Sequence, residues 1–291
     1  MFQGFEKLNV KTRYVRFAGL VGGSGPAVLL LHGYPQTHLT WRYIAPALAG
    51  GYSVILPDLP GYGDSRIVEG GGRWTKRRVG EALIDLMQAL GHSRFAIVGH
   101  DRGARVGYRM ALDFPHMVRS YSSLTVIPTL DAFAGVDAAF ALNAFHWFML
   151  AQPNGLPERL LAGDPIGFVD AALTSMAGSL DRFEPEVLSA YRAAFNNPAV
   201  RHAICEDYRA AAFEDREIDS ADRQAGRKLS CPVSVLWPQR DNAVGPTPLD
   251  IWRDWADDVS GHAVEGGHLL PEFSSQAVLD HLVPFLSRVA S

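Results

Sequence analysis

The stretch Gly99–Arg105, with the sequence GHDRGAR, restricts the possible folds of this chain more than any other. It follows the apolar run Phe95–Val98, which is typical of a short buried strand, and it precedes Val106–Leu112, whose sequence favours a helix. A strand, a sharp turn and a helix, with small residues two positions before and after the central one, form a nucleophile elbow. Glycines at both flanking positions permit the close backbone approach that the turn requires. The pattern predicts that Asp101 lies at the tip of the turn, where the familiar motif has serine.

An aspartate at this tip favours displacement of a leaving group from a saturated carbon. A carboxylate is already ionised at neutral pH, so it can attack without a base. The product would be an alkyl ester of Asp101, which water can hydrolyse, whereas a serine would form an ether that water does not release. The elbow therefore indicates the chemistry of dehalogenases and epoxide hydrolases more than ester or peptide cleavage.

Length and composition limit the other possibilities. The chain has 291 residues, 47% of them hydrophobic, which is enough for one large core or for a core with a cap. A net charge of −4 implies no basic face for nucleic acid, and no apolar run approaches the roughly 18 residues that a membrane span needs. The N-terminal residues lack a signal-peptide pattern and the two cysteines make no disulfide framework. We expect a cytoplasmic protein with free thiols.

Strand-like and helix-like segments alternate as far as Pro128, which predicts a mostly parallel sheet with helices on both faces. Asn9–Phe17 alternates loosely and predicts one edge strand. From residue 130 to about 227 the pattern is helical, and the sheet resumes at Val233–Trp237. We therefore expect an α/β fold with a core domain of residues 1–129 and 228–291 and an inserted helical cap of residues 130–227.

Displacement by Asp101 also needs a base for the second step. His268 follows the last expected strand, Gly261–Val264, in the kind of loop that holds catalytic groups in such folds. The ordinary alternative is a loop histidine, and His262 is a nearby competitor. When water attacks the ester, backbone N–H groups of Arg102 and Tyr34 are the expected oxyanion donors, although the segment around Tyr34 could be a plain turn.

Arg102 and Arg105 are three positions apart at the start of the expected helix, so they share a face. The helix N-terminus favours an anion, and two guanidinium groups there form a fork for a carboxylate. The alternative is an ion pair with a neighbouring acid. Arg109 extends the stripe by one turn, and we expect it to be structural.

Four segments together resemble the haloacetate (fluoroacetate) dehalogenase family: His32–His38 (HGYPQTH), Pro57–Ser65 (PDLPGYGDS), Gly99–Arg105 and, in the cap, Cys205–Ala210 (CEDYRA). The resemblance implies an α/β-hydrolase fold with a helical cap, no cofactor and a homodimer. It also implies that the elbow aspartate attacks the carbon bearing the halogen, and that a histidine then activates water on the ester.

The same resemblance implies roles for five further side chains. Arg102 and Arg105 match the pair that holds the substrate carboxylate. His146, Trp147 and Tyr208 match the residues that receive the halide, and their N–H and O–H groups are suitable donors to a developing anion. Without the resemblance, these three would be interpreted as ordinary cap core.

One position departs from the family pattern. The family carries its triad acid as Leu-Asp before Ile-Pro-Thr, where this chain has Leu124-Thr125. Threonine cannot hold a charge against an imidazolium. The other customary place is the loop after Val233–Trp237, which contains Asp241. We expect Asp241 to orient His268; the alternatives are a plain loop aspartate and an ion pair with Arg240.

The leading interpretation is hydrolytic dehalogenation of a short 2-haloacid, such as haloacetate, to the 2-hydroxy acid and halide. An epoxide hydrolase with the same nucleophile is the alternative, with Tyr191 or Tyr208 as proton donor, but an epoxide has no carboxylate for the arginine pair. A hydrolase-fold binding protein with impaired turnover is a third possibility, and Thr125 is its support.

Overall fold

The computed structural model describes residues 1–69, 71–239 and 245–290. Among these residues, nine strands form one sheet in the order β1-β2-β4-β3-β6-β7-β8-β9, with β5 paired to β2. The strands are β1 (Phe5–Lys11), β2 (Val15–Gly22), β3 (Ala27–Leu31), β4 (Ser53–Pro57), β5 (Arg66–Ile67), β6 (Phe95–His100), β7 (Val118–Leu124), β8 (Val233–Pro238) and β9 (Val259–Val264). From β4 to β9 every pairing is parallel, which confirms the expected α/β sheet.

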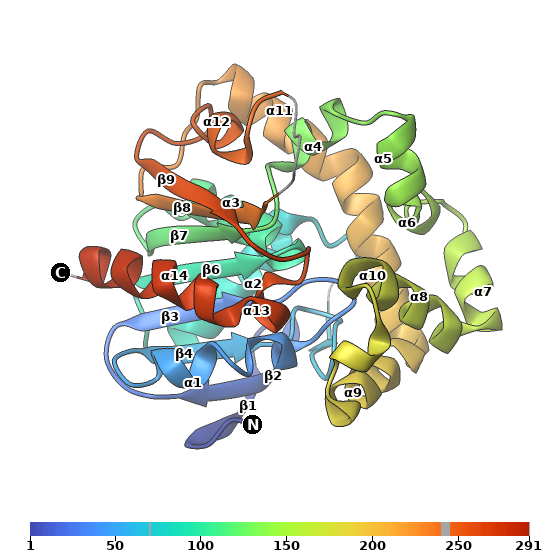
Figure 1. The fold of residues 1–291 in the computed structure, drawn as a ribbon, viewed down its shortest axis with the longest axis horizontal. Helices are drawn as coiled ribbons and strands as arrows, with labels where there is room; N and C mark the ends of the chain where they lie inside the picture. Colours follow the sequence, from blue (N-terminus) through green and yellow to red (C-terminus); the bar gives the residue numbers. More distant parts are fainter. Residues whose placement is uncertain (70, 240–244, 291) are drawn as a thin grey trace.

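Helices cover both faces of this sheet, and they are η1 (His38–Trp41), α1 (Ala45–Leu48), α2 (Lys76–Ala89), α3 (Arg102–Asp113), α12 (Pro248–Trp252), α13 (Leu270–Phe273) and α14 (Ser275–Ala290). Alternate residues of β3 enter two cores. Val28 and Leu30 pack with α1 and α14 on the near face in Figure 1, whereas Leu29 and Leu31 pack with α2 and α3 on the other. A strand buried on both faces is apolar at every position, as β3 is.

All the cap helices lie between β7 and β8: α4 (Thr129–Ala134), α5 (Ala138–Asn143), α6 (Phe145–Leu150), α7 (Leu156–Gly163), α8 (Pro165–Ala177), η2 (Leu180–Arg182), α9 (Pro185–Asn196), α10 (Pro198–Ala210), the π-helical turn η3 (Ala211–Asp215) and α11 (Arg216–Gln224). They stand beside the sheet on the right of Figure 1. Because β3, β6 and β7 run parallel, their C-terminal ends lie at the same edge of the sheet. The loops that follow these strands therefore meet at that edge.

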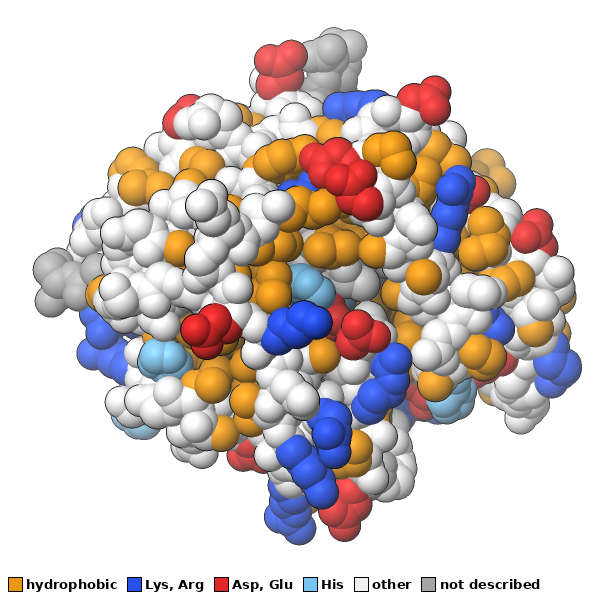
Figure 2. Space-filling view, turned by 90° about the horizontal axis from the view of Figure 1, so that it is seen from below, with side chains coloured by type: hydrophobic (Ala, Val, Ile, Leu, Met, Phe, Trp, Pro, Cys, Tyr) orange, Lys and Arg blue, Asp and Glu red, His pale blue; other side chains and the backbone are white. Residues whose placement is uncertain are grey.

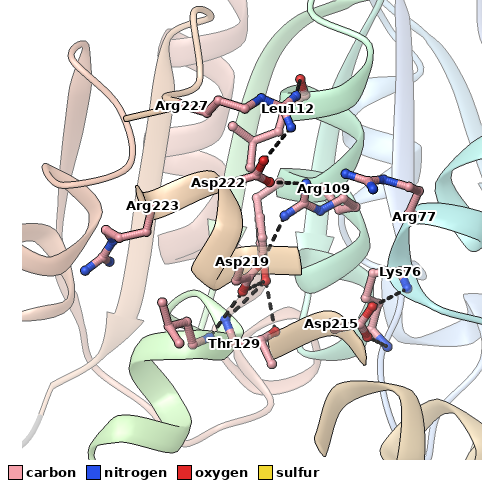
Figure 3. Close-up of polar contacts among 12 residues, drawn as sticks. Lys76, Arg77, Arg109, Leu112, Thr129, Asp215, Asp219, Asp222, Arg223 and Arg227 are labelled. Carbon is pink, nitrogen blue, oxygen red and sulfur yellow. Dashed lines mark hydrogen bonds and ion pairs between the residues drawn. The ribbon is translucent and has the colours of Figure 1, made fainter. Parts of the chain in front are cut away.

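Buried ion pairs join α11 to the core (Figure 3). Arg109 of α3 donates from Nη2 to Asp219 Oδ1 at 2.8 Å, and its Nη1 pairs with Asp222. Arg227 donates to the carbonyl of Leu112 at 2.8 Å, which fixes the end of the cap against the same helix. Arg109 therefore belongs to the seam between cap and core.

Two further properties bear on the expectations above. Cys205 and Cys231 are both buried and unpaired with each other. No helix in the described parts of the chain combines the length and apolarity that a membrane span requires.

Candidate active site

Asp101 is the single residue between β6 and α3. Its backbone conformation is one that few non-glycine residues adopt (φ 49°, ψ −115°). The turn is crowded: a Cβ on Gly103 would lie 2.3 Å from the carbonyl oxygen of Leu31, and one on Gly99 would lie 2.4 Å from Cα of Ala104. Only glycine fits at either position. Strain of this kind collects at functional sites, and here it presents a carboxylate at the edge of the sheet beneath the cap.

The two carboxylate oxygens of Asp101 have different partners. Oδ1 accepts a hydrogen bond of 2.9 Å from the backbone N–H of Tyr34, and Oδ2 lies 3.5 Å from Nε2 of His268. Burial alone would raise the pKa of Asp101, but the interactions with His268, His100 and Arg102 lower that pKa well below the usual range. Asp101 is therefore ionised at neutral pH. The N–H of Arg102, the other expected oxyanion donor, forms no hydrogen bond to this carboxylate.

His268 lies in the loop between β9 and α13, and about a third of its side chain is exposed. Its carbonyl accepts a hydrogen bond of 2.8 Å from Nε2 of His100, a fully buried residue that directly precedes Asp101. Burial lowers the pKa of His100 to about 4, so this ring is neutral at pH 7. His100 was missed in the sequence because histidine before an elbow has no distinctive spacing. The competitor His262 lies on β9 against His281 of α14.

Arg102 and Arg105 are both almost fully buried, and each has a buried nitrogen without a hydrogen-bond partner. Arg102 donates from Nε to Asp207 Oδ2 at 2.6 Å and from Nη2 to the Asp207 carbonyl at 2.9 Å, so Nη1 is left over. Arg105 donates from Nη1 to the carbonyl of Ile127 and to Thr129, both at 3.1 Å, and its buried Nε has no hydrogen-bond partner. Buried unpaired donors are costly, so these N–H groups are available to an acceptor that enters the site.

His146, Trp147 and Tyr208 come together with Tyr34 in one aromatic group. The rings of His146 and Tyr34 are stacked with centroids 5.4 Å apart, and Tyr208 lies 5.7 Å from His146 and 6.5 Å from Trp147. Burial lowers the pKa of His146 to about 4 and raises the pKa of Tyr208 well above its usual value. Both rings are therefore neutral at pH 7 and can donate a hydrogen bond.

These aromatic rings also meet the arginines. The guanidinium carbon of Arg102 lies 4.3 Å from the centre of the Tyr208 ring, and that of Arg105 lies 4.9 Å from the centre of the Trp147 ring. Cations stacked on aromatic faces in a dry site are held in place as well as attracted. The structure thus brings together the elbow, the arginine pair and all three cap residues that the sequence singled out.

The acid of the expected triad is a different case. Asp241 lies outside the described residues. Within the described residues, Asp101 is the only acid that contacts the His268 ring. Thr125 has a left-handed backbone (φ 72°), and its buried hydroxyl has no hydrogen-bond partner. A threonine in this conformation is unusual, because the region suits Asn, Asp and Gly better than β-branched residues.

Tyr191, one of the two tyrosines considered for epoxide opening, belongs to a buried polar cluster. Its hydroxyl pairs with the carboxylate of Glu272 and also lies 3.4 Å from Nε2 of Gln36. Glu272 in turn accepts from Gln36 at 2.6 Å and pairs with Arg42. The Tyr191 hydroxyl is therefore committed to this cluster.

The surface around the cap is hollowed. Figure 2 shows a hollow on the face seen from below, with hydrophobic side chains and a histidine inside it. A cavity of about 810 Å³ lies between the segment 59–74 and α10, and its lining includes Tyr62, Glu206 and Asp207 but not Asp101 or His268. Because Asp207 also contacts Arg102, this carboxylate borders both the cavity and the candidate site.

One group of side chains has spacing compatible with a metal ion: Glu158, His202 and Glu206 offer ligand atoms within 4.8 Å of one another. However, Arg209 already donates from Nη1 to both carboxylates, at 2.7 Å to Glu158 and 2.6 Å to Glu206. A guanidinium thus occupies the place a cation would take.

Comparisons with known proteins agree with this geometry. A family model described as the alpha/beta hydrolase fold matches residues 26–274. The chain is 43% identical over 240 residues to a fluoroacetate dehalogenase from Burkholderia sp., covering 81% of this chain and 78% of that one. It is 30% identical over 275 residues to a soluble epoxide hydrolase from Corynebacterium sp. strain C12, covering 92% of each.

A solved structure from Pseudomonas aeruginosa, provisionally described as an epoxide hydrolase, superposes with a TM-score of 0.96 at 53% identity, covering 99% of this chain and 97% of that one. The parallel sheet and the inserted cap are thus shared with that solved structure. The chain belongs to the α/β-hydrolase superfamily, and within it to the dehalogenase family that its four sequence motifs indicate.

Proposed function

We propose that this hydrolase converts a short 2-haloacid, such as haloacetate, to the 2-hydroxy acid and halide through a covalent ester of Asp101. The observation that carries the proposal is the pair of buried arginines, Arg102 and Arg105, that keep N–H groups without protein partners next to an ionised elbow carboxylate. The Burkholderia relative, a fluoroacetate dehalogenase, supports the same substrate class.

In the first step, Arg102 and Arg105 bind the substrate carboxylate and align the carbon that bears the halogen. Oδ1 of Asp101 is engaged by the N–H of Tyr34, so Oδ2 is the attacking oxygen. It attacks that carbon from the side opposite the halogen. The new C–O bond forms as the carbon–halogen bond breaks. The electron pair leaves with the halide, which His146, Trp147 and Tyr208 receive as hydrogen-bond donors already in place.

In the second step, His268 removes a proton from water, and the oxygen attacks the carboxyl carbon of the Asp101 ester. Negative charge then develops on Oδ1, where the Tyr34 N–H already donates, with the Arg102 N–H as the second proposed donor. Collapse releases the 2-hydroxy acid, which takes the proton from His268. We expect Asp241 to orient the ring of His268 and to stabilise its charged form.

Epoxide hydrolysis remains the second candidate, because the Corynebacterium relative carries that name. The commitment of the Tyr191 hydroxyl to Glu272 disfavours it, since only Tyr208 then remains to protonate an opening epoxide. A substrate panel separates the two activities: we expect halide release from fluoro-, chloro- or bromoacetate and no diol from styrene oxide. Haloacetate that binds without halide release would instead favour the binding protein with impaired turnover.

Single turnovers in water enriched in heavy oxygen test the two-step scheme. With enzyme in excess over chloroacetate, the first glycolate should carry the unlabelled oxygen of Asp101, and the label should enter Asp101 before it enters the product. Label in the first glycolate would mean that water attacks the substrate directly, which would reject the ester. The family resemblance further implies a homodimer, which light scattering on the purified protein would test.

A further inference from the structure

We infer that Asp207, on cap helix α10, is a positioning residue that fixes Arg102 so that its free N–H binds the substrate carboxylate rather than the nucleophile. This inference rests on the proposed function and extends it to a residue of the cap. Asp207 immediately precedes Tyr208, a proposed halide donor.

Both side-chain oxygens of Asp207 are fully used within the cap–core interface. Oδ2 accepts from Arg102 Nε at 2.6 Å and from the Tyr62 hydroxyl at 3.0 Å, and Oδ1 pairs with Nζ of Lys76. The backbone carbonyl of Asp207 accepts a second hydrogen bond from Arg102, at 2.9 Å. Two bonds from one guanidinium to one residue fix its plane, and they leave Nη1 as its only unpaired nitrogen.

This anchoring solves a problem created by the position of Arg102. Arg102 follows Asp101 directly, and its guanidinium is close enough to lower the pKa of a carboxylate that must stay free to attack. An unanchored arginine would be drawn to that carboxylate, because opposite charges attract strongly in a site of low dielectric constant. Binding Nε and Nη2 to Asp207 satisfies most of the guanidinium, and the stacking on Tyr208 limits its rotation.

Because Asp207 and Tyr208 are consecutive residues of α10, one turn of the cap contributes to both ends of the proposed substrate. Tyr208 faces the halide and Asp207 holds the arginine that faces the carboxylate. Lys76, at the start of core helix α2, links this part of the cap to the core. Its side chain pairs with Asp207, and its backbone N–H donates to Asp215 of η3 at 2.8 Å. The arginine fork is therefore assembled only when the cap is seated on the core.

Asp222 provides the matched control. It is also a buried aspartate of the cap that pairs with an arginine of α3, namely Arg109, at the same seam (Figure 3). Among the described residues, the side chains of its partners Arg109 and Arg227 form no hydrogen bond or ion pair with Asp101, Arg102 or Arg105. Losing Asp222 should therefore weaken the seam without disturbing the fork.

The test compares Asp207→Asn with Asp222→Asn in binding acetate, a carboxylate that cannot react, by titration calorimetry. We expect the dissociation constant of acetate to rise at least tenfold in Asp207→Asn and to change less than twofold in Asp222→Asn. The KM for chloroacetate should rise in parallel with acetate binding. Unchanged acetate binding in Asp207→Asn, or an equal loss in Asp222→Asn, would overturn the inference.

Asp207→Asn leaves Lys76 with one acidic partner fewer in a buried cluster, so its folding needs a safeguard. The double variant Asp207→Asn, Lys76→Met removes one charge of each sign and replaces lysine by a side chain of similar length. It should show the same loss of acetate binding, and normal binding in a folded double variant would contradict the inference. Acetate binding needs no turnover, so a wild-type enzyme that releases no halide would refute the proposed function alone.

Discussion

At the scale of single residues, the ionisation of Asp101 is the property on which the chemistry depends. An unperturbed aspartate has a pKa of about 3.9, and the interactions with His268, His100 and Arg102 hold the pKa of Asp101 well below that value. A lowered pKa means that the attacking form persists as the pH falls and is lost only when the pH passes through the lowered value. Isotope-edited infrared spectroscopy of the Asp101 carboxyl group should therefore show the carboxylate band at both pH 7 and pH 4.

An ordinary aspartate would instead be about half protonated at pH 4, so about half of its carboxylate band would be replaced by a carboxylic-acid band. Such a change, in protein shown by circular dichroism to remain folded, would contradict the assigned environment of Asp101.

Asp241 carries a second prediction at this scale. If it orients His268, Asp241→Asn should slow hydrolysis of the ester by at least about tenfold while leaving ester formation nearly unchanged, because the base acts only in the second step. Quenched-flow measurement would then show a burst of halide, one per site, before slow turnover. Turnover equal to that of the wild type would leave Asp241 as a plain loop residue.

The residues that the sequence brought out are those whose type is unusual at a recognisable spacing, such as Asp101 and the arginine pair. Asp207 lay inside a motif that was singled out, yet its role was missed because it depends on how α10 rests on α3. His100 was missed for the same reason, since its partner is the His268 carbonyl far along the chain. Contacts between distant segments leave no periodic trace in the sequence.

At the scale of elements, close backbone packing around Gly99 and Gly103 determines the conformation of the elbow. Gly103→Ala would place a Cβ 2.3 Å from the Leu31 carbonyl oxygen, so α3 or β3 must move. We expect this variant to lose about 3 kcal/mol in the free energy of unfolding and most of its activity, since overpacking against backbone cannot be relieved by a side-chain rotation. Gly135→Ala is the control, because its nearest neighbour would lie at 3.7 Å.

Urea denaturation of the two glycine variants supplies the measurement. Equal stability of Gly103→Ala and Gly135→Ala would show that the turn after β6 can relax, and that the close packing of β3 on α3 does not define the elbow.

The turn after β7 offers an opposite case. Thr125 occupies a left-handed conformation that disfavours β-branched residues, and its hydroxyl has no partner. Thr125→Asn should raise the free energy of unfolding by about 1 kcal/mol, because asparagine tolerates this conformation. A decrease in thermal or urea stability would show that packing of the Thr125 methyl group stabilises the fold by more than the backbone strain destabilises it.

Elements were predictable where periodicity and turn residues agreed. The buried strands β6 and β8 and the helix after the elbow lie where their apolar patterns placed them. The single edge strand expected over Asn9–Phe17 was wrong: the structure has two strands, β1 and β2, with a turn between Lys11 and Val15. The turn carries neither glycine nor proline, so the loose alternation ran through it without a break.

At the scale of the whole molecule, the site forms where two separately built parts meet. The core supplies Asp101, His268 and the two arginines, while the cap supplies the aromatic donors and Asp207. Buried ion pairs at Arg109 and Lys76 join the parts on either side of this site. The sequence predicted the order of core, cap and core, but not which charges cross between them, because each partner is ordinary within its own helix.

The central step of the proposed mechanism is a covalent bond between the substrate carbon and Asp101, and trapping that bond tests the mechanism directly. His268→Gln removes the base for the second step, so the variant mixed with chloroacetate should release one halide per site and then stop. Mass spectrometry of the digested protein should find one added carboxymethyl group on the peptide that contains Asp101, and His262→Ala should turn over normally without it. A variant that releases halide without modifying Asp101, or that carries the group elsewhere, would contradict the account.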